Sequence, residues 1–252
     1  MTSKTTKTTK TTPLIGKYVF HNKKFNTITF NISRSNNDEK RFEHLMKTAH
    51  QTQAIIIGIH NYGDNDQIIT ALSAEFGRIQ FVAHNSKRLG KKRFPLVDLF
   101  RVITFEFSNS KNSEFSKVSK IELLQNFDSI AGNYYHLQFL SWIADFLRRN
   151  SIHGNSYHLS VQHLLDCLKA LGEIKKINDE TPWKTSSLLA FFSEQGYLPE
   201  DSEAQEELRQ ILMQVPQHPE LITRFDKDYW QSIYQWCLEL CYFHELKIPD
   251  PL

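Results

Sequence analysis

The chain has 252 residues, of which 40% are hydrophobic and 23% charged, a balance typical of a folded globular protein and not of a disordered or fibrous one. Its length allows one large domain or two modest ones, and we expect two. No apolar stretch approaches the roughly 20 residues that a membrane span needs, and the Thr- and Lys-rich start lacks the apolar segment of a signal peptide. Three cysteines suit a reducing compartment, so we expect a cytoplasmic protein.

Positive charge is unevenly distributed along the chain. The formal net charge of +2 is too small to indicate a polyanionic partner, because attraction to phosphates depends on the local density of positive charge. Residues 78–93, however, contain six cations and no Asp or Glu, whereas residues 194–207 contain six acids and no Lys or Arg. The near-neutral total therefore conceals a basic and an acidic region.

The first 52 residues carry weak structural signals. Residues 1–13 repeat Thr and Lys and have nothing to bury, so we expect a disordered basic tail. Residues 14–52 combine the spacing of a short strand near Phe25 with that of a brief helix near Leu45. We treat residues 14–52 as an N-terminal extension without an assigned role.

Residues 53–127 carry the pattern of a small β domain. Five segments fit short strands: residues 54–59, 67–73, 78–83, 99–107 and 118–123. The spacing of the second segment also fits a helix, but a hairpin closing around Gly77 favours a strand. In the fourth segment, alternation predicts Leu99 and Arg101 on the same face as Phe105. Five short strands in about 70 residues are typical of a small closed barrel, so we predict an OB fold over residues 53–127.

After Phe127 the apolar residues recur every three or four positions, which is typical of helices. We predict five helices, over residues 130–149, 157–171, 183–195, 208–215 and 229–246. The first has Tyr134 on its inward stripe, and Gly172 and Gly196 terminate the second and third. The predicted fold class is therefore α+β, an N-terminal OB-fold β-barrel followed by an all-helical C-terminal domain over residues 128–252.

The order of these features resembles the RecO family of bacterial DNA repair proteins. Residues 53–70 (QAIIIGIHNYGDNDQIIT) are similar to that family's first strand, Tyr-Gly-Asp turn and second strand. Residues 75–79 (EFGRI) resemble its hairpin tip, and residues 82–88 (VAHNSKR) resemble the segment that follows and usually ends in a basic pair. Residues 188–199 (LLAFFSEQGYLP) resemble a helix end in the family's second domain. The resemblance is good over residues 53–127, looser over the helices and absent earlier.

This resemblance implies a non-enzymatic DNA repair and recombination mediator of the RecF pathway, located in the cytoplasm with the nucleoid. Such a protein binds single- and double-stranded DNA, anneals complementary strands, and acts with RecR and the single-strand-binding protein (SSB) to load RecA. The resemblance also implies that the acidic C-terminal tail of SSB docks on the helical domain, for which Arg148 and Arg149 are the candidates. No cofactor is implied.

Two departures from the family pattern bear on these expectations. Many members place four zinc-binding cysteines after the Gly-Tyr helix end, whereas the residues that follow Pro199 here are acidic and contain no cysteine before Cys237. We therefore expect no structural zinc ion. The usual Ala-Lys-Gly-Ala-Arg segment is replaced by AHNSKR at residues 83–88, which changes the expected shape of this loop.

Five of the cations lie within residues 87–93, on a connection between two predicted strands. There they can follow a phosphate backbone and release its condensed counterions. The plain alternative is a solvated loop that is polar because loops face water. The barrel context and the resemblance favour nucleic acid, so the predicted DNA-binding residues are Arg78, Lys87, Arg88, Lys91, Lys92 and Arg93.

Aromatic rings beside these cations can add base stacking, a common contribution to single-strand binding. Tyr62, Phe76 and Phe94 lie at turns or next to the cations and are the stacking candidates. Phe81 alternates with other apolar residues, so we predict it in the core.

Metal ligation and catalysis have weak support in the sequence. His163 with Cys167, and Cys237 and Cys241 with His244, share helix faces, but no Cys-x-x-Cys pair anchors either set and leucines surround the first. Ordinary packing is the better explanation, so we expect no metal site.

The sequence contains no Gly-rich phosphate loop, no Gly-x-Ser-x-Gly and no His-Glu-x-x-His motif. Asp64 and Asp66 could be read as an acid pair, but turn capping explains them equally well. We therefore expect no catalytic residue and no enzymatic activity. Two other functions stay open: an OB-fold RNA or tRNA binder, and a protein adaptor whose basic loop contacts an acidic partner without binding DNA.

Overall fold

The computed structural model describes seven ranges: residues 20–22, 25–28, 49–87, 98–109, 114–174, 177–199 and 203–250. The predicted tail and the predicted helix near Leu45 lie outside them, as do Arg88, Lys91 and the residues up to Phe94. Within the N-terminal extension, strands β1 (Phe20–Asn22) and β2 (Phe25–Ile28) pair as an antiparallel hairpin, which confirms the strand predicted near Phe25.

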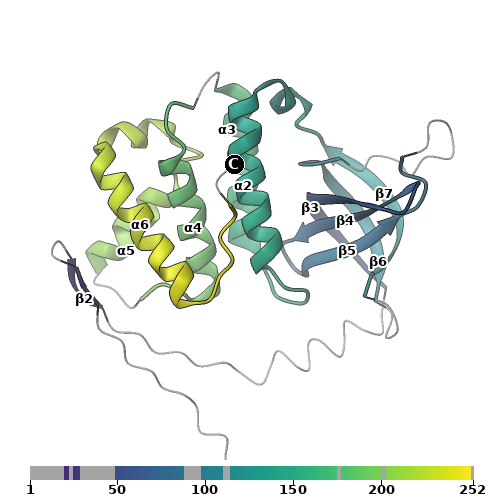
Figure 1. Ribbon diagram of the computed structural model, residues 1–252, viewed down its shortest axis with the longest axis horizontal. Coiled ribbons are helices and arrows are strands. Elements are labelled where there is room, and N and C mark those ends of the chain that lie inside the picture. Colours follow the sequence, from purple (N-terminus) through teal and green to yellow (C-terminus); the bar gives the residue numbers. More distant parts are fainter. Residues whose placement is uncertain are drawn as a thin grey trace, which may run out of the picture.

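A five-stranded antiparallel sheet follows and confirms all five predicted strands. Its strands are β3 (His50–Tyr62), β4 (Asp66–Ser73), β5 (Gly77–Ala83), β6 (Val102–Ser108) and β7 (Lys117–Gln125), in the order β5-β4-β3-β6-β7. The edges of the sheet approach each other, because the Ser116 amide beside β7 donates to the Gln80 carbonyl of β5 at 2.8 Å. The sheet is therefore the curled barrel of an OB fold, and it begins at His50, shortly before the predicted start (Figure 1).

Strand β3 holds the barrel together because it pairs on both sides. It pairs with β6 over its first half and with β4 from Ala54 to Tyr62, with a bulge between Ile56 and Gly58. A bulge bends a strand and increases its twist, which a small barrel requires. The alternation of β5 sends Ile79, Phe81 and Ala83 into the barrel core, so the predicted burial of Phe81 is confirmed.

The segment before β6 departs from the prediction. Leu99 is 38% exposed, and neither it nor Arg101 belongs to the strand, which begins at Val102. The chain instead turns here: Phe100 has a φ of 62°, is buried, and its amide donates to the Ile56 carbonyl at 2.9 Å. The alternating pattern was therefore extended too far toward the N-terminus.

The second half of the described chain is helical, as predicted. Its elements are the 3-10 helix η1 (Asp128–Gly132), the helices α2 (Tyr134–Asn150), α3 (His158–Glu173), α4 (Thr181–Gln195) and α5 (Glu203–Met213), the 3-10 helix η2 (Pro219–Arg224), and α6 (Lys227–Phe243). Gly196 ends α4 in the left-handed conformation, as predicted. Gly172 does not end α3, which continues to Glu173, and Tyr134 is 70% exposed instead of buried. None of the described helices is long and apolar enough to cross a membrane.

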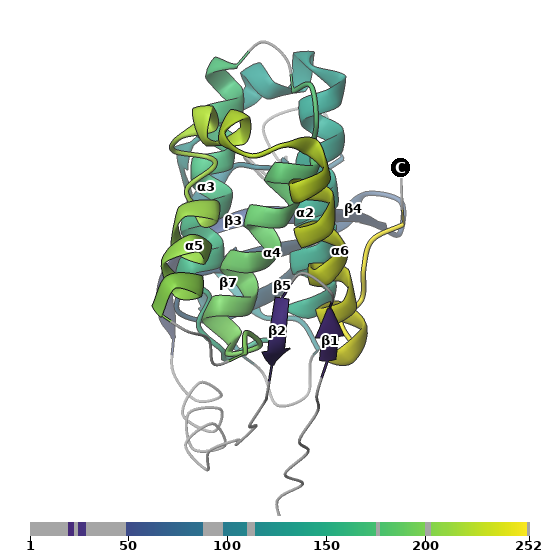
Figure 2. The same cartoon turned by 90° about the vertical axis from the view of Figure 1, so that its left-hand side faces the viewer.

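The helices lie over one outer face of the barrel, with α2 next to the sheet (Figure 1), and Figure 2 shows the helical layer in front of the strands. Ile55, Ile57 and Leu72 point away from the barrel interior and join the helical core. The outer face of the barrel and the helices therefore share one apolar cluster, while the barrel interior forms a second cluster that includes Phe81 and Phe105.

The turn between β4 and β5 is inserted into the loop between α2 and α3. The Gly154 amide donates to the Phe76 carbonyl at 2.8 Å, and the Tyr157 amide donates to the Ala74 carbonyl at 2.7 Å. Gly77 forms a backbone bridge with His153 and has a φ of 67°. These backbone hydrogen bonds fix the orientation of the barrel against the helices.

Candidate nucleic-acid interface

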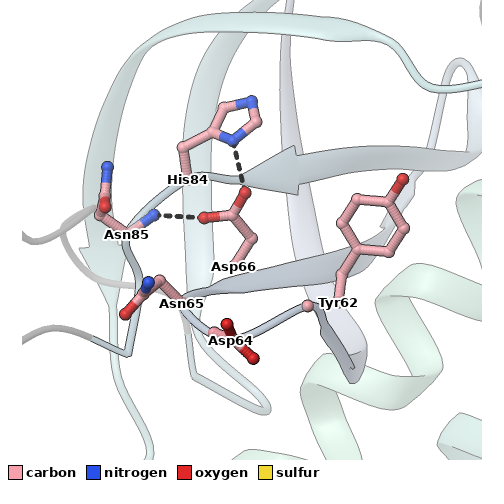
Figure 3. A pocket seen from close by; sticks show the side chains of 7 residues that line it. Tyr62, Asp64, Asn65, Asp66, His84 and Asn85 are labelled. Carbon is pink, nitrogen blue, oxygen red and sulfur yellow. Dashed lines mark hydrogen bonds and ion pairs between the residues drawn. The ribbon is translucent and has the colours of Figure 1, made fainter.

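The end of the barrel that bears Lys87, which we call the cation-bearing end, is formed by two connections. One is the β3–β4 turn, residues 63–65, and the other is the chain that leaves β5 after Ala83. Together they line an open hollow (Figure 3). The labelled side chains of Tyr62, Asp64 and Asn65 point in different directions around it, whereas those of Asp66 and His84 point toward each other.

The carboxylate of Asp66 joins the two connections. One of its oxygens lies 2.8 Å from His84 Nδ1, and the other accepts a hydrogen bond from the Asn85 backbone amide, also at 2.8 Å (Figure 3). Asn85 has a φ of 56°, a left-handed conformation that Asn tolerates better than most residues. Asp66 thus accepts a hydrogen bond from the backbone of the chain that leaves β5, in agreement with the turn-capping interpretation of this acid.

Lys87 is the first cation of the basic segment, which we define as residues 87–93. Its amide donates to the Asn65 carbonyl at 3.1 Å, and its Nζ donates to the Gly63 carbonyl at 3.1 Å. Lys87 is exposed, so its charge is available at the surface of the barrel end. The remaining four cations of the segment lie outside the described residues, and their role in DNA binding stays a prediction.

Arg78 lies at the opposite end of β5 from Lys87. Its guanidinium Nη1 donates to the Arg148 carbonyl at 2.8 Å, and its amide donates to the Ile152 carbonyl at 3.3 Å. These contacts give Arg78 a structural role at the junction with the helices. The prediction that it also binds DNA is untested, but the structure does not place it beside Lys87.

The three stacking candidates have different environments. The Tyr62 side chain is 49% exposed at the end of β3, whereas the Phe76 ring packs against His50 and Phe107 at centroid distances of 5.1 and 5.3 Å. Phe94 lies outside the described residues. Of the two that are described, Tyr62 alone stands at the cation-bearing end.

Phe115 is a ring that the sequence did not single out. It approaches Tyr62 edge-on, with ring centroids 6.2 Å apart, and belongs to the loop between β6 and β7. OB folds bind oligonucleotides with the loops after their first and fourth strands, which here contain Tyr62's turn and Phe115. The sequence could have indicated Phe115 only by its place in the loop between the fourth and fifth strands, because no cation is next to it.

The proposed SSB-tail residues already face a carboxylate within the chain. The Arg149 Nε donates to Asp145 Oδ2 at 2.7 Å, and the Arg148 Nε donates to Asp145 Oδ1 at 3.0 Å. An acidic peptide would therefore compete with Asp145 for these guanidiniums. Docking of the tail at this place stays a prediction.

The candidate metal ligands His163 and Cys167 are both buried, with Cys167 Sγ 3.6 Å from His163 Nδ1 and Ser186 Oγ 3.1 Å from His163 Nε2. Burial raises the pKa of the Cys167 thiol, which disfavours the thiolate that a metal needs. Within the described ranges, no group of three or more His, Cys, Asp or Glu side chains is arranged to hold a metal ion.

Acid should destabilise the protein through His163. Burial lowers the pKa of His163 to about 4, so between its unfolded-state pKa and that value only the unfolded chain binds the proton. Stability should fall by about 2 kcal/mol from about pH 7 to about pH 5 on this account. Urea unfolding at both pH values measures this effect. The free energy of unfolding of His163→Gln should fall by about 2 kcal/mol less than that of the wild type between them. His60→Gln, at an exposed position on β3, is the matched control and should behave as wild type. An unchanged pH dependence in His163→Gln would contradict the prediction.

Comparison with known proteins agrees with this architecture. Residues 46–127 match the family model described as the N-terminal domain of recombination protein O. The chain is 29% identical over 143 residues to the DNA repair protein RecO of Mesoplasma florum, which covers 56% of this chain and 51% of that protein. It is 25% identical over 145 residues to RecO of Pelotomaculum thermopropionicum, which covers 56% of each protein. It is 23% identical over 100 residues to RecO of Halalkalibacterium halodurans, which covers 40% of this chain and 39% of that protein. The chain thus spans about half or less of the length of these curated relatives. The barrel is therefore the part of the chain that matches the RecO N-terminal domain, and the chain is similar to RecO proteins over up to about half of its length.

Proposed function

We propose that this chain is a DNA repair and recombination mediator that binds single- and double-stranded DNA and anneals complementary strands. Its similarity to the DNA repair proteins RecO of three bacteria supports the repair and recombination role. The observation that carries the DNA-binding part is the position of Lys87, the first cation of the basic segment: it is held on the β3–β4 turn of an OB-type barrel, directly after Tyr62, whose ring contacts Phe115. Cations and exposed rings at one end of such a barrel are the usual components of a single-strand site.

Annealing needs no covalent step in this proposal. Lysine and arginine side chains neutralise part of the charge of two phosphate backbones, which lets the strands approach while their bases stay free to pair. Holding two strands together also raises their effective concentration.

The same proposal includes the protein partners. The mediator would act with RecR and with the acidic tail of SSB to load RecA onto coated DNA, within the cytoplasm and near the nucleoid. Arg148 and Arg149 are the proposed contacts for the tail, in exchange with Asp145.

Strand annealing measured at several salt concentrations tests the function directly. Two complementary labelled oligonucleotides should anneal faster with the protein than without it, also when both are coated with SSB. The acceleration should decline steeply as salt rises, because counterion release drives phosphate binding. An annealing rate equal to the spontaneous one at low salt would refute the proposal.

A further inference from the structure

Two neighbouring arginines at the end of α2 share a carboxylate. Asp145 accepts hydrogen bonds from Nε and Nη2 of Arg148 and from Nε of Arg149. A guanidinium carries five N–H donors, so in the described part of the chain most donors of this arginine pair are available to a second anion. Both side chains are accessible, with 29% of Arg148 and 32% of Arg149 exposed. The pair therefore has the donors and the access that an anionic ligand needs.

The charge around the arginine pair is positive. Arg78 adds a third guanidinium from β5, where its Nη1 donates to the Arg148 carbonyl at 2.8 Å. Besides Asp145, the acid that faces the pair within the described ranges is Asp250, whose Oδ2 lies 4.0 Å from Arg149 Nη2 and whose side chain is 93% exposed. Such an exposed ion pair is weak. Three guanidiniums therefore exceed the two carboxylates by one charge, and the more exposed carboxylate is loosely held.

Arg148 lies on the outward face of the barrel. A Cβ atom at Gly58 would be 2.9 Å from Arg148 Cδ and 3.3 Å from Thr70 Cβ, so glycine leaves the room that lets the arginine rest on the sheet. The register places Gly58 beside Thr70 and Thr70 beside Gln80, whose Nε2 donates to Thr70 Oγ1 at 3.2 Å. The arginine pair therefore adjoins the outer surface of β3, β4 and β5.

The same face continues from Arg148 to the cation-bearing end. Side chains of alternate residues point to the same side of a strand. The next outward row consists of His60, Ile68 and Val82. The histidine of this row is exposed and its two apolar residues are partly exposed. The row after it contains Tyr62 and Asp66, and both oxygens of Asp66 are already bonded. An accessible strip of sheet thus joins the arginine pair to Tyr62.

A single strand of nucleic acid is the occupant that this strip fits. The second and third strands of OB folds, here β4 and β5, form the face that binds oligonucleotides. The strip has cations at both ends, Lys87 and the arginine pair, and the two rows nearest the arginines contain no acid. Strand β5 has seven residues, or about 23 Å, which is the length of about seven stacked nucleotides. An OB fold typically engages roughly 4–16 nucleotides.

We propose that Arg148 and Arg149 bind a backbone phosphate of a single strand that lies along the outward face of β3, β4 and β5, between the arginine pair and the cation-bearing end. The inference rests on the proposed DNA-binding function and deepens it, since it adds an anchor on the helical part of the chain. A guanidinium binds phosphate through two parallel hydrogen bonds, as it binds a carboxylate. The acidic tail of SSB, proposed above for the same pair, would therefore compete with the strand.

The first test is fluorescence anisotropy of a labelled oligo-dT with the double variant Arg148→Met, Arg149→Met. Methionine keeps an apolar stem over Gly58 and removes both charges. Binding at 0.1 M salt should weaken by about five- to 25-fold, and the slope of log affinity against log salt should become shallower by about 0.7 to 1.4, the loss of one or two phosphate contacts. The matched control is Lys169→Met, Arg224→Met, which removes two exposed cations from the helical part and should bind within about twofold of the wild type.

A second pair of variants tests the path of the strand and leaves the arginines intact. His60→Glu places a carboxylate on the strip, whereas Leu124→Glu places one on the outer surface of β7, at a side chain that is 49% exposed. His60→Glu should weaken oligo-dT binding at least about threefold, because its charge repels the phosphates that pass it. Leu124→Glu should bind within about twofold of the wild type.

The outcomes separate this inference from the proposed function. If the arginine variant lost binding of SSB and kept the wild-type affinity and salt slope for oligo-dT, the pair would be a peptide site alone. That result, or equal affinities of His60→Glu and Leu124→Glu, would overturn the inference and leave the proposed function standing. A wild-type protein that does not bind oligo-dT would overturn both.

Discussion

Replacing Gly77 with alanine is expected to destabilise the protein by about 2–4 kcal/mol, combining left-handed strain with overpacking. Gly77 has a φ of 67°, and a Cβ atom there would lie 2.2 Å from the Ile152 carbonyl oxygen and 2.8 Å from that of Asn155. Both contacts are with backbone at the junction between barrel and helices, which cannot move without breaking the hydrogen bonds of Gly154 and Tyr157. Urea unfolding followed by circular dichroism measures the loss.

Gly63→Ala separates the two causes of this loss. Gly63 has a similar φ of 62°, but a Cβ atom there would have nothing within 4 Å. Its substitution should cost only the left-handed penalty, about 1 kcal/mol. Equal losses for the two variants would show that Gly77 is needed for its conformation alone, and that the close junction described here is wrong.

Replacing the five cations Lys87, Arg88, Lys91, Lys92 and Arg93 with alanine is expected to weaken single-strand binding about a thousandfold at 0.1 M salt. Each phosphate contact on a single strand contributes about 0.7 to the slope of log affinity against log salt. Five contacts therefore raise the affinity at 0.1 M salt by about 3.5 orders of magnitude over the affinity at 1 M salt. The acceleration of annealing should be lost as well. Anisotropy titrations and the annealing assay measure the two effects.

A variant without Lys169, Arg224, Lys227 and Lys247 is the control for net charge. These cations are exposed on the helical part of the chain. Their replacement should leave oligonucleotide affinity within about threefold, because charges beyond a Debye length are screened. Equal losses of affinity in both variants would contradict a localised site.

The two alternative functions predict other results. Unchanged annealing in the five-cation variant together with lost SSB binding would favour a protein adaptor. Tighter binding of structured RNA than of single-stranded DNA at equal salt would favour an RNA binder.

The elements of this fold were predictable because their apolar periodicity is local. The alternation in β5 and the three-and-four spacing in α3 and α4 each identify a buried face within one segment. The error before β6 occurs where a tertiary contact overrides the pattern. Phe100 turns inward and joins the apolar core of the helices before β6 begins.

The candidate site was predictable in part. Cation density and the Tyr-Gly turn marked the barrel end, and the structure places Tyr62 and Lys87 there. The contact between Tyr62 and Phe115 joins residues more than 50 positions apart. Arg78 and Lys87 lie at opposite ends of β5, as the register of the sheet shows. Neither can be deduced from composition, because the curling of the barrel decides which loops meet.

The salt dependence of wild-type binding to oligo-dT tests the central claim most directly. If the five cations of the basic segment engage one strand, log affinity should decline with log salt at a slope of about −3.5. A slope near zero, or no measurable binding even at low ionic strength, would contradict an interface built on neutralising phosphates at this end of the barrel.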